Sequence, residues 1–430
     1  MKKRILITTL FLMTVSIAFV SCSDDEDPIA TPEITGGNDD DPMMGGGDDD
    51  PLTMVDFDAN GDWTQETLDA FTDRLGINDD ATGADESAFA FTTVSTTIGN
   101  TVLPTDFTAT QTLSGEITGD VTLDANEVYE IVGAVFVRDG GVLNIPAGTF
   151  LFANSENNAA VNGDVTAADV IVVSQGGILN AVGTADNPVV FSSATQVSGS
   201  WGGIVMMGNA PINLAGGVGN AEVADNVGED LPYGGTVADD SSGNLSYVIL
   251  AYPGTQINTE AEFNGFSFYG VGSGTTLNFL QVFQGQDDGF EWFGGTVNAS
   301  NLFSEGFDDS FDWAEGFVGT LDNIIADQPS GADHCIEADN LSADNDASPR
   351  SNPTVMNATL NSSGDDDAVR LRRGTAVQMN NIFFDISGNS RVHFEIDDVV
   401  TGQLILDDVT TFENIAIDAG NPAFSGNANN

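Results

Sequence analysis

Four short phrases in the second half of the chain decide the fold: QDDGFE at residues 286–291, FDDSFD at 307–312, ADHCIE at 332–337 and DDDAVR at 365–370. Each phrase contains a pair of aspartates or an Asp-His pair, and one apolar residue and one charged residue end it. The apolar residues, Phe290, Phe311, Ile336 and Val369, recur at intervals of roughly 20 to 35 residues. A repeat of this length without helical periodicity indicates a solenoid or a propeller.

The rest of the long body repeats the same style of sequence. Short runs such as Val170–Val173 are rich in β-branched residues, which favour strands, and Gly, Asn, Asp and Ser separate these runs. GGVLNI at 140–145 and GGILNA at 176–181 are near copies. Propeller blades need about 40 residues each, so the shorter spacing favours a coil. We therefore predict an all-β fold, a right-handed parallel β-helix (a solenoid) over residues 112–420, followed by a tail over 421–430.

Stacked coils would place the polar residues of the four phrases in two columns. Each coil adds one rung about 4.8 Å from the last, so residues at equal positions lie above one another. The first column holds Asp288, Asp309, His334 and Asp367, and the second holds Glu291, Asp312, Glu337 and Arg370, with His393 expected to continue it. Side chains alternate along a strand, so an inward Phe290 leaves Glu291 outward, and a slip of one residue reverses both.

The first residues of the chain have the pattern of an export signal over residues 1–21. Three basic residues precede the apolar stretch Ile5–Val20, and the small residue Ser21 stands directly before Cys22. This arrangement resembles the lipobox of bacterial lipoproteins, which implies cleavage before Cys22 and lipidation of that residue. The alternative is plain secretion with cleavage nearby.

An acidic tether is expected over residues 22–51. Its Gly, Pro and Asp residues cannot bury apolar surface, so we expect it to be disordered. Ser23–Asp27 resembles the export signal of surface lipoproteins of the Bacteroidota, and a simple hydrated linker is the alternative. The expected location is the outer membrane at the cell surface, with the membrane as a partner through the lipid.

The charge of the chain is extreme, with 66 acidic and 10 basic residues. Nucleic acid is therefore excluded as a partner, and anionic lipid is disfavoured. Calcium, a saline medium or a cationic ligand suits such a surface better. If Cys22 is lipidated, Cys335 stands alone, so no intrachain disulfide is expected, and its neighbours favour a buried apolar role over a nucleophilic one.

Residues 52–111 look like a small separate region that contains one short helix. Four oxygen-bearing residues there, Asp56, Asp58, Asn60 and Asp62, have the spacing of a calcium-binding loop around Gly61. The closing carboxylate is missing, because Thr67 stands at its expected position. The alternative is an acidic turn that caps a helix over Thr67–Leu75, whose apolar residues fall on one face.

Seven stretches of the chain are similar to a family of β-helix surface lipoproteins of the Bacteroidota and related marine bacteria. They are WGGI at 201–204, YGGT at 233–236, FNGF at 263–266, DDGFEWFGGTV at 287–297, GFDDSFDW at 306–313, EADN at 337–340 and LRRGT at 371–375. The resemblance covers roughly residues 112–420. It implies the fold but no activity, because a fold alone does not define a function.

The first functional hypothesis is binding or adhesion to an extracellular ligand, a polysaccharide or a surface protein. A rigid rod on a tether would present one long sheet face, with Glu291, Asp312, Glu337 and Arg372 as polar contacts. Four aromatic residues, Trp201, Trp292, Trp313 and Tyr269, would stack on sugar rings. The alternative for these aromatic residues is that they fill the interior of the coil.

The second hypothesis is hydrolysis, since the order of Asp288, Asp309, His334 and Arg370 resembles that of polygalacturonases, which share the β-helix fold. That resemblance implies a carboxylic acid as proton donor, carboxylates that activate water, and basic groups that hold an anionic sugar. Departures weaken it: Arg372 stands where a lysine is expected, and His334 lacks flanking glycines. They favour a protein that is not an enzyme. The third hypothesis is a structural protein in which paired aspartates bind calcium between rungs.

Overall fold

The computed structural model describes residues 52–93, 98–154, 159–161, 164–257, 261–364, 366–386, 391–418 and 420–429. The predicted signal peptide, the lipidation site Cys22 and the acidic tether lie outside the described residues. The described residues belong to one compact unit, within which all the contacts discussed below lie. No helix among the described residues is long and apolar enough to cross a membrane.

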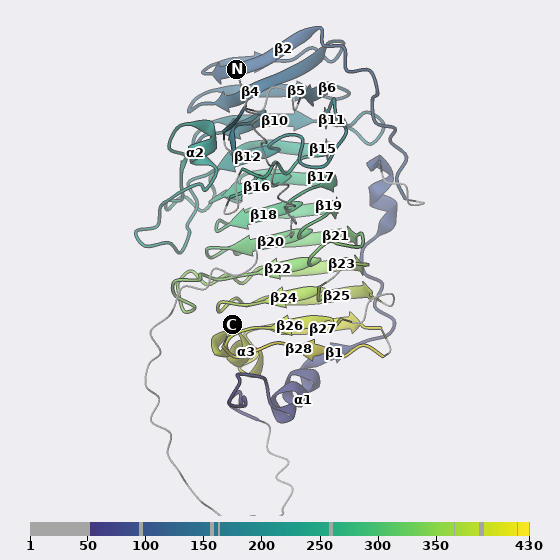
Figure 1. Ribbon diagram of the computed structural model, residues 1–430, viewed down its shortest axis with the longest axis vertical. Helices are drawn as coiled ribbons and strands as arrows, with labels where there is room; N and C mark the ends of the chain where they lie inside the picture. Colours follow the sequence, from purple (N-terminus) through teal and green to yellow (C-terminus); the bar gives the residue numbers. More distant parts are fainter. Residues whose placement is uncertain are drawn as a thin grey trace, which may run out of the picture. The chain divides into compact units, whose positions relative to one another are not determined.

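The described part of the chain winds into a parallel β-helix, as predicted, in which 24 strands form one continuous sheet (Figure 1). The first coils contain β2 (Gln111–Ile117), β3 (Asp120–Thr122), β4 (Val128–Val137), β5 (Val142–Pro146), β6 (Phe150–Ala153), β10 (Ile178–Val182) and β11 (Val189–Ser193). Later coils are simpler and consist of one long and one short strand each. All pairs between successive coils are parallel and in close register, so equivalent residues stack.

The short strands form one face, which we call the short-strand sheet. It consists of β9 (Val170–Val173), β12 (Ile204–Met207), β16 (Phe266–Tyr269), β18 (Phe290–Phe293), β20 (Phe311–Ala314), β22 (Ile336–Ala338), β24 (Val369–Leu371), β26 (Phe394–Ile396) and β28 (Phe424–Ser425). Phe290 pairs with Phe311, Phe311 with Ile336, and Ile336 with Val369. The register predicted from the four phrases is therefore confirmed. Phe290 is buried and Glu291 partly exposed, which settles the inward and outward sides.

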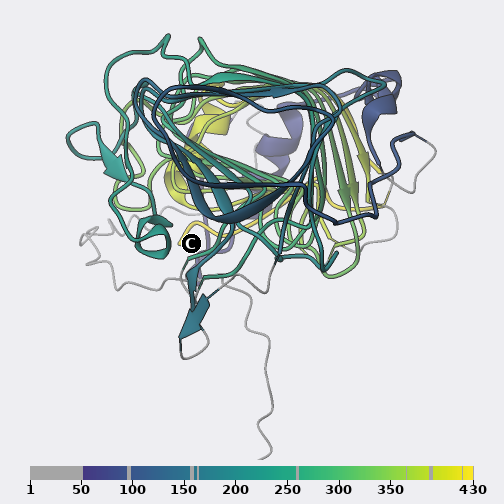
Figure 2. The same cartoon turned by 90° about the horizontal axis from the view of Figure 1, so that it is seen from above.

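The long strands form the other two faces of the coil (Figure 2). They are β15 (Gly243–Ala251), β17 (Thr276–Gly285), β19 (Ala299–Gly306), β21 (Thr320–Gln328), β23 (Thr354–Ser362), β25 (Gln378–Asp385) and β27 (Thr411–Ala416). Each contains at least one residue with positive φ, and in five of the strands this residue is an asparagine: Asn301, Asn323, Asn357, Asn381 and Asn414. Asparagine tolerates this left-handed conformation, which allows the strand to turn a corner without ending.

These asparagines also connect neighbouring rungs. Asn323 Nδ2 donates to Asn301 Oδ1 at 2.6 Å, and Asn381 Nδ2 donates to Asn357 Oδ1 at 2.8 Å. The sequence shows the pattern, because the first pair is 22 residues apart and the second 24, close to the repeat of the four phrases. This row of hydrogen-bonded asparagines, the asparagine ladder, was not predicted from the sequence.

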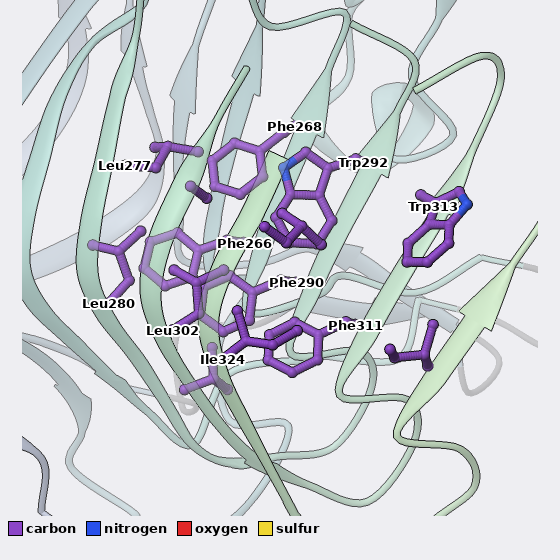
Figure 3. Close-up of a cluster of buried hydrophobic side chains, with 14 of the residues drawn as sticks. Phe266, Phe268, Leu277, Leu280, Phe290, Trp292, Leu302, Phe311, Trp313 and Ile324 are labelled. Carbon is purple, nitrogen blue, oxygen red and sulfur yellow. The ribbon is translucent and has the colours of Figure 1, made fainter. Parts of the chain in front are cut away.

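The interior of the coil is filled by stacked aromatic and aliphatic side chains (Figure 3). The rings of Phe266 and Phe290 lie 5.1 Å apart and nearly parallel, and Phe290 and Phe311 continue the stack at 5.6 Å. Trp292 stacks beside them on Phe268 at 5.6 Å. Cys335 is buried in the same core as a free thiol. The parallel stacking follows from the register, since each rung repeats the ring of the previous one.

The N-terminal region is not separate from the β-helix, contrary to the prediction. Helix α1 (Gln65–Asp73), capped by Thr64, packs against the last coil through Phe71, whose ring lies 5.6 Å from that of Phe424. Strand β1 (Leu75–Ile77) then pairs with β27 and adds a further rung. Because this pairing partner is more than 300 residues away in the sequence, the local sequence pattern does not indicate it.

From β1 the chain runs back along the long strands toward the first coil as a strap, which is described over residues 78–93 and 98–110 (Figure 1). The backbone N–H groups of Thr82 and Asp85 donate to the asparagine ladder, at Asn381 and Asn323 respectively. The short 3-10 helix η1 (Glu86–Phe91) follows, and its Phe89 packs on Phe303. The strap thus fastens the last coil to the first.

The remaining elements lie outside the coil. Two hairpins, β7 (Ala159–Val161) with β8 (Asp164–Ala167) and β13 (Gly219–Asn220) with β14 (Pro232–Tyr233), are antiparallel. The helix α2 (Ala224–Val227) lies within the same insertion as β13 and β14, between β12 and β15, while α3 (Val399–Leu406) lies near the last coil. The insertion packs against the outer side of β9, β12 and β16, which are the first three strands of the short-strand sheet.

The stacked ring of Phe290 should be one of the main contributors to stability. We expect Phe290→Ala to lower the free energy of unfolding by about 3–5 kcal/mol, because it removes a buried aromatic side chain and leaves a cavity. Chemical denaturation measures the change. Phe307→Ala is the control, because Phe307 is 43% exposed. Equal losses for the two variants would contradict the assigned core register.

Candidate functional site

The outward residues of the short-strand sheet form a charged column. Glu291 pairs with Asp312, Asp312 with Glu337, Glu337 with Arg370, and Arg370 with Glu395. The column predicted from the sequence is confirmed for its first four members. The prediction that His393 continues it is wrong, because Glu395 takes that place. His393 is buried, with Nδ1 3.0 Å from the carbonyl oxygen of Pro422.

The other predicted column, which holds Asp288, Asp309, His334 and Asp367, lies in the turns that precede the same strands. Its carboxylates accept backbone N–H groups from the next rung. The backbone N–H of Asp309 donates to Asp288 Oδ1 at 3.2 Å, and that of His334 donates to Asp309 Oδ1 at 2.6 Å. Further along, the N–H of Val392 donates to Asp367 Oδ1 at 2.8 Å. These carboxylates thus bind turns of successive rungs together, which is a structural reason for an acid at each position.

His334 is a member of this turn column and is 1% exposed. Its Nδ1 atom lies 3.1 Å from Asp309 Oδ1, 3.3 Å from Asp333 Oδ1 and 3.9 Å from Glu337 Oε1. Burial alone lowers the pKa of the imidazole, but the charge and hydrogen bond of Asp309 and the other carboxylates outweigh it and raise the pKa to about 10. Asp309 and His334 therefore meet as predicted, and Asp288 lies one rung away.

The C-terminal half of the site is balanced by arginines. Arg370 Nη2 lies 3.0 Å from Asp397 Oδ2, and Arg370 Nη1 lies 3.5 Å from Glu337 Oε1. Arg372 forms ion pairs with Glu337 and, at 2.7 Å, with Asp339. The side chains of both arginines are about 15% exposed, so ion pairs rather than water satisfy most of their charge. Burial nevertheless raises the pKa of Glu337 to about 7, in spite of Arg372.

The N-terminal half of the site is acidic without such balance. Within the described ranges, no ion pair joins Glu291 or Asp312 to a basic side chain. Asp288, Glu291 and Asp312 bring carboxylate oxygens within 4.8 Å of one another, and so do Glu262, Asp287 and Asp308. Burial, followed by the charges of neighbouring acids, raises the pKa of Asp312 well above its usual value and that of Asp308 to about 8.

Two further acids of the site were not predicted: Glu222, from the insertion between β12 and β15, and Glu315, which follows β20. Tyr269 donates to Glu222 at 3.3 Å, and Tyr233 donates to Glu315 at 2.7 Å, with the two tyrosine rings 4.9 Å apart. Burial raises the pKa of Glu222 to about 7 and that of Glu315 to about 6. Glu222 comes from a part of the chain that carries none of the four phrases, so no repeat signal indicates it.

The predicted sugar-stacking role of Trp292 and Trp313 is wrong. Both side chains are fully buried inside the coil, as are those of Trp201 and Tyr269, and Trp313 Nε1 donates to Thr375 Oγ1 at 3.1 Å. Strand alternation explains this result, because Trp292 lies two residues after the inward Phe290 and therefore shares its side. The alternative given for these aromatic residues, that they fill the coil, is the observed one.

The predicted calcium loop is used as a turn. Asp58 Oδ1 accepts from the N–H groups of Asn60 at 2.7 Å and Asp62 at 3.1 Å, and Asn427 donates to Asp62 at 2.9 Å. Among the described residues, no group of acids or histidines that converges within 4.8 Å includes Asp56, Asp58 or Asp62. The loop contacts the C-terminal residues of the chain, which satisfy part of its polar groups.

Comparison with known proteins identifies the fold family. Residues 115–429 match the family described as the pectate-lyase-like beta-helix domain. No curated protein and no solved structure matches the chain. The match agrees with a right-handed parallel β-helix and spans the short-strand sheet with all its charged columns.

The raised carboxyl pKa values predict that stability depends on pH. An acid whose pKa is higher in the folded state than in the unfolded chain favours folding at low pH, and this contribution is lost as the pH rises through the folded-state pKa. The carboxyls of Asp308 and Glu337 have raised pKa values of about 8 and about 7. We expect the free energy of unfolding to fall between about pH 4 and about pH 8, on the order of 1–3 kcal/mol per group.

Urea denaturation at a series of pH values in low salt measures this slope. Asp312→Asn should make the slope shallower, because it removes one of the interacting buried acids. Asp186→Asn, which changes an exposed acid in a turn, should leave the slope unchanged. A stability that rises over the same pH range would contradict the raised pKa values of these acids in the folded state.

Proposed function

We propose, since the chain belongs to the pectate-lyase-like β-helix family, that it binds an extracellular polysaccharide along the outward column of the short-strand sheet. The observation that carries the proposal is the row of partly buried acids, Glu291, Asp312 and Glu337, on three successive rungs. Sugar hydroxyl groups donate well to carboxylates, and hydrogen bonds to charged groups contribute about 1.5–3 kcal/mol each. A repeating ligand suits a repeating row of acceptors.

The charge of the site narrows the ligand class. An anionic polyuronate would meet Asp288, Glu291 and Asp312 without an adjacent ion-paired base, so direct binding there is unfavourable. A neutral or cationic polysaccharide suits the N-terminal half of the column. Calcium is a second ligand that suits this half of the column. Groups of carboxylates within 4.8 Å of one another offer the hard oxygen ligands that it prefers.

A second candidate function is hydrolysis of the bound polysaccharide. One observation favours it: Asp309 and His334 are in contact, and the acids around them have pKa values raised to between about 6 and about 8. Such values allow a carboxylic acid to donate a proton near neutral pH and a neighbouring carboxylate to activate water. The backbone contacts of Asp288 and Asp309 explain the same residues without catalysis, so binding remains the preferred proposal.

The proposed setting is the cell surface. The sequence-based expectation of a lipid on Cys22 and a flexible acidic tether supports it, since these would hold the β-helix away from the outer membrane. A surface protein is the alternative partner that the same charged face would accept.

Binding to a panel of neutral, cationic and anionic polysaccharides tests the proposal with the full chain. We expect binding to a neutral or cationic polymer, and a loss of about tenfold or more in affinity for Asp312→Asn and Glu291→Gln, as one charged hydrogen bond is removed. The same Asp312→Asn change should raise stability at pH 8, so lost binding would not reflect unfolding. Asp186→Asn is the control.

Reducing ends released from the bound polymer separate the two candidate functions. Release that is abolished by Asp309→Asn would support hydrolysis. The absence of binding to every polysaccharide, or binding that Asp312→Asn and Glu291→Gln leave unchanged, would contradict the proposed role of the column.

A further inference from the structure

One aromatic side chain lies on the outer face of the short-strand sheet and remains partly exposed: Phe293, the last residue of β18. Side chains alternate along the strand, so Phe293 shares the outward side with Glu291, whereas Trp292 points into the coil (Figure 3). Among the described short strands, the other outward aromatic residue is Tyr269, which is 1% exposed and packs with the insertion between β12 and β15. Phe293 is therefore the aromatic ring of this sheet that a ligand reaches from solvent.

The ring of Phe293 is stacked on one face only. It pairs in register with Tyr269, and the two rings lie 4.0 Å apart and within 5° of parallel. The opposite face is turned toward β20, where the residue in register is Ala314. A methyl group does not cover a phenyl ring, and Ala314 is itself partly exposed. Solvent therefore reaches the space between Phe293 and Ala314, which we call the stacking step.

Carboxylates flank the stacking step before and after it along the strands. Glu291 and Asp312 lie two residues earlier on the same two strands and on the same outward face. Glu315 follows Ala314 directly, and its Oε2 accepts from the Tyr233 hydroxyl at 2.7 Å. A carboxylate has about four acceptor positions, so Glu315 keeps acceptors for a ligand. The step thus combines one apolar aromatic face with oxygen acceptors at its edges.

We propose that Phe293 is the stacking residue of the polysaccharide site and that the site accepts β-linked pyranose sugars with equatorial hydroxyl groups. Such a ring presents C–H groups on its faces and hydroxyl groups at its edge. The C–H face matches the uncovered face of Phe293, since the face of an aromatic ring carries partial negative charge. The edge hydroxyls match the flanking carboxylates. This inference rests on the proposed polysaccharide binding and adds the class of sugar and the residue that selects it.

The alanine at position 314 is what keeps the stacking step open. A larger side chain there would lie in register with Phe293 and cover it, as Phe293 covers Tyr269. Ala314→Phe therefore fills the step from the outward side and removes no side chain of the core. It separates the stacking contact from the hydrogen bonds of the neighbouring acids.

Calorimetric titration of the full chain with two sugar hexamers tests the proposal. Cellohexaose, a chain of β-linked glucose, is the neutral probe, and the matching glucosamine hexamer is the cationic one. We expect at least one of them to bind. Phe293→Leu should weaken that binding by about 3- to 10-fold, which is the usual contribution of an aromatic contact beyond its area. Ala314→Phe should weaken it by about tenfold or more, and Phe293→Tyr should keep the wild-type affinity.

Proton magnetic resonance of the bound hexamer gives a readout that a merely structural role would not change. Protons above the face of an aromatic ring are shielded, so the axial ring protons of the sugar should shift upfield. The shifts should persist in Phe293→Tyr and disappear in Phe293→Leu. Phe383→Leu is the control, because Phe383 is 39% exposed on β25, away from the short-strand sheet. The denaturation midpoint of Ala314→Phe should equal that of the wild type.

Different results would overturn this inference and the proposed function. Binding that Glu291→Gln weakens but that Phe293→Leu and Ala314→Phe leave unchanged would keep the proposed function and remove Phe293 from it. Binding without upfield shifts would do the same. If another polysaccharide binds and neither hexamer does, the assigned class of sugar is wrong. If no polysaccharide binds at all, the proposed function and this inference are both wrong.

Discussion

The in-register stacking of short parallel strands is the constraint on which the rest of the structure depends. Side chains alternate along each strand, so the inward position of Phe290 forces Glu291 outward. Register then repeats both choices on each rung, which builds an aromatic stack inside the coil and a charged column outside it. The core and the candidate site lie on opposite faces of the same strands. A shift of the strand register by one residue would turn the core side chains outward and the site side chains inward.

The charged column has two halves that differ in electrostatic balance. In the C-terminal half, Arg370 and Arg372 form ion pairs with Glu337, Asp339 and Asp397. In the N-terminal half, acids from β18, β20 and the turns before them lie together, and among the described residues no ion pair joins Glu291 or Asp312 to a basic side chain. Burying like charges in this way costs stability, and such sites are typical of binding or catalytic surfaces rather than of structural ones. The turn column is different, because its carboxylates accept backbone N–H groups from the next rung.

The fold and the main columns were predictable because their signal is periodic in the sequence. Phe290, Phe311, Ile336 and Val369 align without any knowledge of the structure, and their outward neighbours follow by alternation. The same alternation places Trp292 beside Phe290 in the core, which excludes a sugar-stacking role for Trp292. His393 lies two residues before Glu395, which follows the inward Phe394 and takes the outward position in the same rung. Glu222, the strap and the pairing of β1 with β27 depend on contacts between distant segments, which no local pattern carries.

The central claim is that the acids of the N-terminal half are buried together without basic partners. Carboxyl ¹³C nuclear magnetic resonance over a pH titration of the full chain tests it most directly, with Asp312→Asn and Glu291→Gln used to assign the signals. The account predicts that several carboxyl groups, those of Asp312 and Glu291 among them, have pKa values well above the usual range of exposed acids in the absence of divalent ions. A titration in which every carboxyl group ionises below about pH 5, as exposed acids do, would contradict it.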